Sequence, residues 1–155
     1  MKIVKCDVTK SGYYLDSSGY ERYLENNKDK FPARAFAFAS AGWHYNHRDE
    51  KCPHDAKIIS ITAREFSKDD FPEVGLTIEL EGAYGGRFEI IYYGVKSYIV
   101  RKRKTNWPLG SSTHGEWLID EVTVCEDDLL NHEIALSDGR IFIKFHDCDF
   151  RFARD

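Results

Sequence analysis

The sequence predicts an α+β fold that is predominantly antiparallel β, with about seven strands and one or two N-terminal helices. Residues 132–146 carry two alternating apolar runs on either side of Asp138-Gly139, which is the strongest short-range signal for a β-hairpin. From residue 56 onward, apolar residues recur with period two at meander spacing. Helical spacing occurs only near the N-terminus. We therefore expect a twisted meander sheet, or a sandwich in which that sheet folds over itself.

The N-terminal part is expected to hold one strand and one helix. Residues 3–8 alternate and predict a short strand. Tyr20, Tyr23 and Leu24 then follow at helical spacing, which predicts a helix of about ten residues capped within residues 16–18. Phe31-Pro32 ends this helix, since the residue before a proline is pushed out of the α region.

Residues 33–41 fit two structures. Their alanines, with Pro32 before the first turn, favour a second short helix. The alternation of Phe36 and Phe38 favours a strand instead. We favour the helix. Gly42 ends the segment, and a polar loop follows up to Asp55.

The strands expected from residue 56 onward follow from alternation and from turn residues. Strands are expected at residues 56–63, 76–81, 88–93, 95–100 and 117–124, followed by the C-terminal hairpin. Residues 66–73, which include Pro72, are expected to form a turn or loop. Residues 146–149 are expected to be the solvated end of the last strand.

The C-terminal hairpin also predicts a register. If Asp138 and Gly139 are the two central residues of a type I′ turn, Leu136 faces Ile141 and His132 faces Phe145 on one side. On the other side Glu133 faces Lys144, an opposite-charge cross-strand pair.

Length, composition and charge limit the class of protein. The chain has 155 residues, 42% of them hydrophobic and 31% charged, which suits one globular domain spanning residues 1–155 and excludes wholesale disorder. The formal net charge of −4 gives no electrostatic case for nucleic acid or an anionic membrane. The first residues lack the apolar run of an export signal, and no stretch is long and apolar enough to span a bilayer. We therefore expect a cytoplasmic protein with four reduced cysteines.

The polar loop before the first long strand is the richest in chemical groups. Zinc accepts imidazole and thiolate ligands, and four of them close a tetrahedral site. The candidate ligands are His44, His47, Cys52 and His54, although their spacing matches no standard zinc finger. The alternative is a polar loop without metal, in which His54 and Asp55 hydrogen-bond to the backbone before the next strand.

The remaining polar segments carry no catalytic signature. The only basic run consists of Arg101, Lys102, Arg103 and Lys104, with Trp107 nearby, and the net charge argues against nucleic acid as a partner. Ser111, Ser112 and His114 share a loop, but the chain has no nucleophile elbow and no phosphate-binding loop. We therefore assign no catalytic residue and no cofactor, with zinc as the alternative.

A protein partner fits this composition best. Aromatic residues make up 14% of the chain, and exposed aromatic side chains are typical anchors of interfaces. Acidic clusters would steer a basic partner. The interface candidates are Trp43, Tyr45, His54, Asp55, Trp107, Asp120 and Glu121.

Three segments carry a resemblance to known proteins. These are Trp43-His44-Tyr45 with the Cys-Pro-His-Asp-Ala run at 52–56, the Leu-Ile-Asp-Glu run at 118–121, and the hairpin start at 132–139. Over residues 31–146 the chain resembles small bacterial β-rich proteins of unknown function, a likeness that implies no activity. In general type it is also similar to immunity proteins of bacterial toxin systems.

These observations give two functional expectations. The first is a non-enzymatic protein-binding domain, for example an immunity protein that masks a toxin domain. The alternative is a metal-binding protein or metal-dependent hydrolase that uses residues 44–55. The sequence leaves the identity of the partner and the oligomeric state open.

Overall fold

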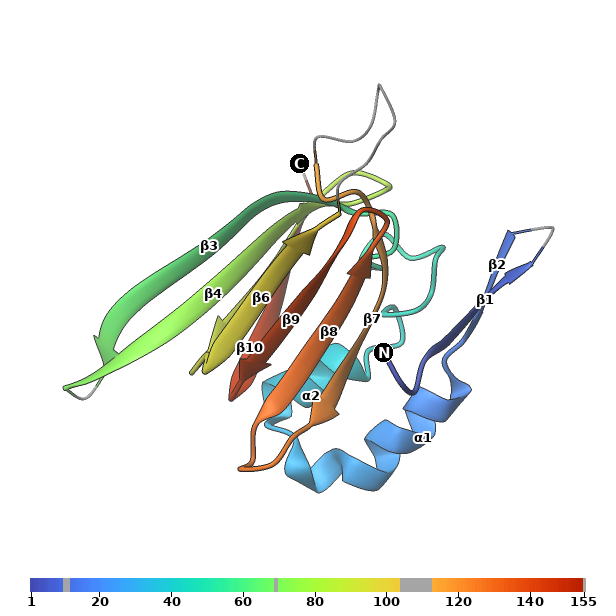
Figure 1. Ribbon diagram of the computed structural model, residues 1–155. Helices are drawn as coiled ribbons and strands as arrows, with labels where there is room; N and C mark the ends of the chain where they lie inside the picture. The colour runs from blue at the N-terminus through green and yellow to red at the C-terminus, as the bar shows by residue number, and fades with distance from the viewer. Residues whose placement is uncertain (10–11, 69, 104–112, 155) are drawn as a thin grey trace.

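The computed structural model describes residues 1–9, 12–68, 70–103 and 113–154. Its main body consists of two four-stranded antiparallel sheets, with two helices and an N-terminal hairpin beside them (Figure 1). The expected α+β fold is therefore confirmed, in its sandwich form. Among the described residues, no helix has both the length and the apolar character needed to cross a membrane.

The two sheets are built from the chain after residue 56. The first sheet has the order β10-β5-β4-β3, and the second has the order β6-β9-β8-β7. The strands of the first sheet are β3 (Lys57–Lys68), β4 (Phe71–Glu81), β5 (Arg87–Tyr93) and β10 (Asp147–Ala153). The strands of the second sheet are β6 (Ser97–Lys102), β7 (Trp117–Val124), β8 (Leu130–Leu136) and β9 (Gly139–Phe145).

The N-terminal region contains a hairpin and both helices. β1 (Lys5–Thr9) pairs with β2 (Gly12–Asp16), where the sequence predicted a single strand. The helix α1 (Ser18–Asn27) confirms the helical spacing, and one 3₁₀ turn (Lys28–Lys30) follows it. Residues 33–39 form the helix α2 (Ala33–Ala39), as the alanines predicted, and not the strand that the alternating phenylalanines favoured.

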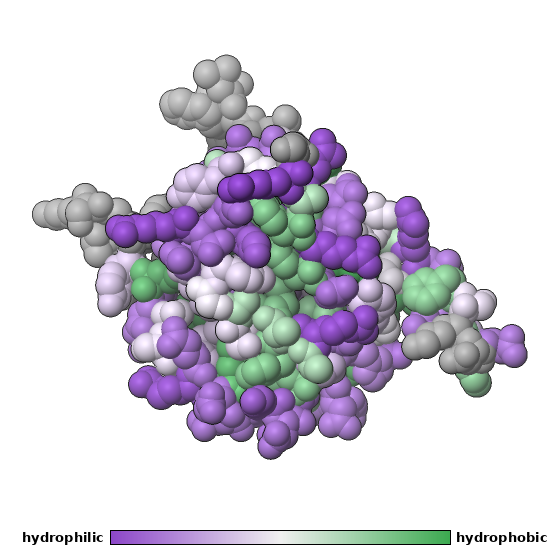
Figure 2. All heavy atoms as spheres, turned by 180° about the vertical axis from the view of Figure 1, so that it is seen from behind, coloured by the Kyte–Doolittle hydropathy of each residue, from purple (hydrophilic) through white to green (hydrophobic). Residues whose placement is uncertain are grey.

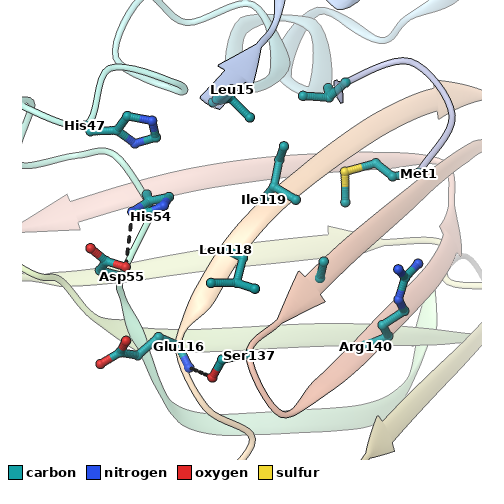
Figure 3. A pocket seen from close by; sticks show the side chains of 12 residues that line it. Met1, Leu15, His47, His54, Asp55, Glu116, Leu118, Ile119, Ser137 and Arg140 are labelled. Atoms are coloured by element: carbon teal, nitrogen blue, oxygen red, sulfur yellow. Dashed lines mark hydrogen bonds and ion pairs between the residues drawn. The ribbon is translucent and has the colours of Figure 1, made fainter. Parts of the chain in front are cut away.

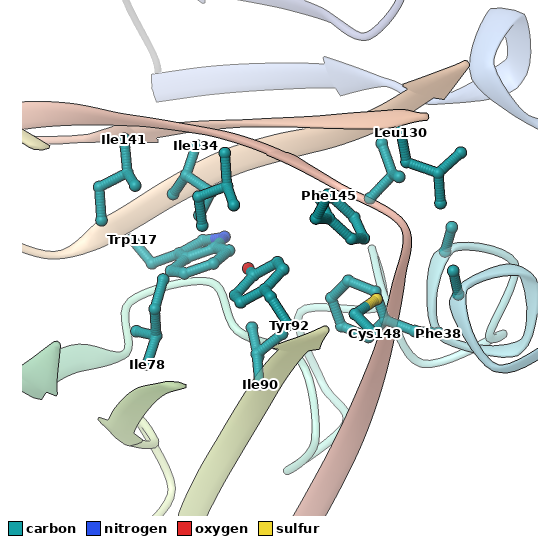
Figure 4. Close-up of a cluster of buried hydrophobic side chains, with 14 of the residues drawn as sticks. Phe38, Ile78, Ile90, Tyr92, Trp117, Leu130, Ile134, Ile141, Phe145 and Cys148 are labelled. Atoms are coloured by element: carbon teal, nitrogen blue, oxygen red, sulfur yellow. The ribbon is translucent and has the colours of Figure 1, made fainter. Parts of the chain in front are cut away.

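The core lies between the two sheets. Period-two burial places the apolar residues of β4, β5, β8 and β9 on facing sides, where they form one cluster. Tyr92 of one sheet meets Phe145 of the other with ring centroids 5.0 Å apart. From α2, Phe38 stacks on Phe150 at 5.7 Å, which fixes the helix against β10. Figure 4 shows these layers meeting around Trp117 and Tyr92.

The C-terminal hairpin forms, with a different register. Leu136 pairs with Gly139 and Ile134 with Ile141, so the turn residues are Ser137 and Asp138. The predicted partners were therefore wrong by two positions, and the expected Glu133–Lys144 pair is replaced by a Glu133–Arg140 ion pair. A shift of two preserves the face of each side chain, so the predicted inward face is correct.

The position of Gly139 explains the shift. A Cβ at Gly139 would lie 2.4 Å from the carbonyl oxygen of Arg101 in the neighbouring strand β6. Its φ is not in the left-handed region, whereas a type I′ turn would require that. The glycine therefore serves the close approach of β6 and not the turn.

Two further expectations were wrong. Residues 66–68 and 71–73 belong to strands and not to a loop, because β3 and β4 pair from Lys57–Glu81 as far as Lys68–Phe71. Residues 147–149 are not a solvated strand end, because they begin β10, which pairs with β5. Pro72 is tolerated near the exposed end of this hairpin.

The surface of the molecule is mixed. Figure 2 views the side opposite to Figure 1 and shows a band of apolar side chains with polar side chains on both sides of it. The exposed large hydrophobic residues include Ile59, Phe66, Phe71, Tyr98 and Ile99. Apolar area is therefore not confined to the core.

Candidate functional site

A β-bulge places the most unusual polar group of the molecule inside the core. In the pairing of β7 with β8, Trp117 faces Leu136 but Ile119 faces Ala135, so one extra residue lies between them. Without the bulge, Trp117 and Asp120 would point to opposite sides of the sheet. With it, both point inward, and the indole Nε1 donates to Asp120 Oδ1 at 3.0 Å.

Asp120 is the centre of a hydrogen-bonded network. Its Oδ2 lies 2.9 Å from Nε2 of His44 and 2.8 Å from Nε2 of His132. The second ring nitrogen of His132 lies 2.8 Å from the Tyr92 hydroxyl, and that of His44 lies 3.1 Å from the carbonyl oxygen of Phe38. The network thus links the polar loop, both sheets and α2.

The partners of the two imidazole rings, together with the balance of charge, indicate where their hydrogens lie. His44 faces a carbonyl oxygen on one side and a carboxylate on the other, and both groups only accept. His44 therefore donates from both nitrogens and carries a positive charge. His132 donates to Asp120 from Nε2. The Tyr92 hydroxyl can donate or accept, and a second buried cation beside one carboxylate would be uncompensated, so we infer that Nδ1 of His132 accepts from this hydroxyl and that the ring is neutral. One cation thus balances the one carboxylate.

Electrostatics keep this arrangement in place. Burial alone would raise the pKa of the Asp120 carboxyl, but the charge of His44 and the hydrogen bonds from His44 and His132 outweigh it. The pKa of Asp120 therefore lies well below its usual range. Burial also raises the pKa of Tyr92 well above its usual value, so its hydroxyl keeps its proton.

The network is closed to solvent. His44, Asp120 and His132 are exposed by only 2%, 1% and 0%, and Tyr92 by 0%. No buried side-chain nitrogen or oxygen among the described residues lacks a hydrogen-bond partner. These groups are therefore buried in this structure, and their hydrogen bonds connect elements that meet in the core.

The four proposed zinc ligands do not come together. The ring of His44 is used inside the network, and the thiol of Cys52 donates to the backbone oxygen of His44 at 3.2 Å. Burial raises the pKa of Cys52 to about 11, so it is not an activated thiolate. Among the described residues, no group of three or more histidine, cysteine or acidic side chains is placed to hold a metal ion.

The other two proposed ligands line a large surface groove. Its volume is about 820 Å³, and it lies on the outer face of β7 and β8 (Figure 3). The floor and the side toward the N-terminus are apolar. They are formed by Met1, Val4, Leu15, Leu118, Ile119 and Ala135.

Polar residues form the opposite rim of the groove. The rings of His47 and His54 are 4.3 Å apart, and His54 Nδ1 lies 3.2 Å from Asp55 Oδ1. Asp55 has a φ of 63°, which is uncommon for a residue other than glycine. Its backbone N–H donates to the oxygen of Trp117 at 2.8 Å, which holds the rim against β7. Burial, followed by the nearby His54, lowers the pKa of His47.

Glu121 holds the N-terminal segment against the outer face of β7. Its carboxylate accepts hydrogen bonds from the backbone N–H groups of Lys2, Ile3 and Val4 at 2.7, 3.0 and 3.1 Å. Glu133 lies directly opposite Glu121 on β8. Two carboxylates in this position would repel each other, and the three N–H donors and Arg140 offset that repulsion.

The interface candidates have separate positions. His54 and Asp55 are at the rim of the groove. Asp120 and Glu121 are buried, so neither carboxylate is on the surface, contrary to our expectation. Trp43 and Tyr45 are partly buried, and the Tyr45 hydroxyl donates to the backbone oxygen of Asp120 at 2.7 Å. Trp107 and Lys104 lie outside the described residues.

Sequence reasoning missed the apolar part of the groove. Leu118, Ile119 and Ala135 read as ordinary strand residues. The sequence carries no signal for the bulge at Leu118, because only the tertiary contacts of Asp120 show that this side chain points inward. The comparison with protein-family models and curated proteins finds no match for the chain.

Proposed function

We propose that the protein is a non-enzymatic binding domain that takes a segment of a protein partner into the groove over β7 and β8. The observation that supports the proposal is the groove itself, an apolar floor beside a polar rim. Contiguous apolar surface with polar borders is typical of interaction sites.

The chemistry of the rim suits binding more than turnover. Asp55 and Glu116 are exposed acids, and Arg140 is occupied by Glu133. A binding segment would place an apolar side chain over Leu118 and Ala135, with polar or basic groups near Asp55. A toxin-neutralising immunity protein would be one instance of such a domain.

The test is a photo-crosslinking residue, p-benzoylphenylalanine, introduced at Ala135 in the floor of the groove. Ala37 on the exposed side of α2 is the matched control position. We expect one discrete crosslinked protein from position 135 and none from position 37. Mass spectrometry then identifies the partner.

The affinity of the identified partner gives the second part of the test. The variant Ala135→Glu should weaken binding at least about tenfold, or 1.4 kcal/mol, because it buries a charge against the apolar segment. The variant Ala37→Glu should bind like the wild type. Crosslinking at both positions alike, or a substrate turned over at the groove, would refute the proposal.

A further inference from the structure

Residues 1–4 lie against the outer face of β7 and form a short strap beside the groove. The strap continues into β1, which pairs with β2 in a two-stranded sheet separate from the sandwich. Met1 and Val4 of the strap line the groove, and Val4 is exposed by only 6%. The strap therefore supplies part of the apolar side of the groove.

One side chain of the sandwich holds the backbone of the strap. The carboxylate of Glu121 accepts from the N–H groups of residues 2, 3 and 4, and no backbone carbonyl among the described residues accepts from them. Glu121 is exposed by only 3%, so these donors take the place of water around its charge. Hydrogen bonds to a charged acceptor are stronger than those between neutral groups. Glu121 therefore determines whether the strap is docked.

Release of the strap would leave two carboxylates facing each other. Glu133 lies directly opposite Glu121 in the pairing of β7 with β8. Like charges in this position destabilise a sheet. Arg140 stays with Glu133 when the strap leaves, but Glu121 loses all three of its N–H donors. The sandwich therefore favours the docked strap.

The docked strap borders the groove and does not fill it. The groove has a volume of about 820 Å³ with the strap in place, and Figure 3 shows Met1 and Leu15 beside the floor residue Ile119. Without the strap, an apolar segment over the floor would face water on that side. Because apolar binding grows with the area removed from water, the docked strap favours a bound segment.

We propose that Glu121 is a positioning residue for the partner segment: it docks the strap, and the docked strap completes the groove. Docking of the strap and binding of the partner are then coupled, and each strengthens the other by the same factor. The inference rests on the proposed function, because the coupled ligand is the segment bound over β7 and β8. Docking itself needs no partner, so it is measured separately.

The first part of the test is hydrogen exchange of the Ile3 and Val4 backbone amides, followed by NMR on the full chain alone. Glu121→Ala should speed the exchange of both amides at least about tenfold, because it removes their charged acceptor. The amides of β8 should exchange as in the wild type. Thr123→Ala is the matched control: Thr123 follows two residues later on the same face of β7 and does not line the groove. It should leave the exchange of the strap unchanged.

A second variant releases the strap without changing the sandwich. Ile3→Pro removes one of the three N–H donors to Glu121, because proline has no backbone N–H. Ile3→Ala keeps that N–H and controls for the loss of the side chain. We expect faster exchange of the Val4 amide in Ile3→Pro than in Ile3→Ala. Unchanged exchange in both Glu121→Ala and Ile3→Pro would overturn the role of Glu121 in docking.

The second part of the test uses the partner that crosslinks to position 135. Glu121→Ala should raise its dissociation constant at least about tenfold, and Thr123→Ala should not. By reciprocity, the bound partner should slow the exchange of the Val4 amide in the wild type, which a merely structural role of Glu121 does not predict. A released strap with unchanged affinity would overturn the coupling and leave the binding proposal intact. No crosslink from position 135 in the wild type would refute both.

Discussion

At the scale of residues, the charge on Asp120 determines how the core is built. A buried carboxylate is tolerated only where hydrogen bonds and a counter-charge replace water. Three N–H donors from Trp117, His44 and His132 supply the hydrogen bonds, and His44 supplies the charge. The proposed zinc ligand His44 and the proposed interface residue Asp120 therefore form hydrogen bonds inside the core.

Asp120→Asn should strongly destabilise the protein. An amide cannot balance the charge of His44, and its NH₂ group competes with the donors around it. Removing one member of a buried ion pair typically costs about 3–5 kcal/mol. Urea unfolding measures the change, and Asp128→Asn in an exposed turn is the control, expected within about 0.5 kcal/mol of the wild type.

The same carboxylate should make stability depend on acid. The pKa of Asp120 is lowered in the folded state, so its contribution is fully present above the unfolded pKa of about 3.9 and is lost as the pH falls toward the folded value. The difference in unfolding free energy between wild type and Asp120→Asn should therefore shrink below about pH 4. A difference that stays constant from pH 7 to pH 3 would contradict this prediction.

At the scale of elements, the sequence predicted the type of each element better than it predicted which residues pair between neighbouring strands. Alternation identified the inward faces of β4, β8 and β9 because burial imposes the same period as the strand. The register of the β8–β9 hairpin was not predictable from Asp138-Gly139. The glycine is needed there because the carbonyl oxygen of Arg101, in a strand distant in sequence, packs closely against it. The bulge at Leu118 was missed for a similar reason, since only the tertiary contact reveals it.

Gly139→Ala should show whether this glycine is required for the close approach of β6 or for the hairpin turn. A methyl group would lie against the carbonyl oxygen of Arg101 and force β6 and β9 apart, with an expected loss of about 1–3 kcal/mol. Gly42→Ala is the matched control, because no atom lies within 4 Å of its added Cβ. It should be neutral or slightly stabilising, by up to about 1 kcal/mol. Equal effects of the two variants on the unfolding free energy would contradict this account of Gly139.

At the scale of the whole molecule, the buried polar network lies inside the sandwich, and the groove over β7 and β8 lies on its surface. The N-terminal half closes the sandwich with α1, α2 and the polar loop, and it also contributes residues to both sides of the groove. The fold class followed from composition and periodicity. The groove could not be predicted, because its floor and its walls come from segments about 100 residues apart that only the folded chain brings together.

A chelator should leave the melting temperature of the protein unchanged. His44 and Cys52 use their polar side-chain atoms in internal hydrogen bonds, so the fold needs no metal to hold them. The zinc alternative predicts the opposite result, a loss of stability in chelator. Thermal unfolding with and without a chelator decides between the two.

The measurement that tests the account most directly is long-range ¹H–¹⁵N NMR of the histidine side chains at neutral pH. The account predicts that His44 carries hydrogens on both ring nitrogens and His132 on Nε2 alone, all of them slow to exchange with water. That pattern would establish a closed network that fixes the core. A neutral His44 ring, or hydrogens that exchange rapidly, would mean that solvent reaches Asp120, and the cluster would then be available for chemistry.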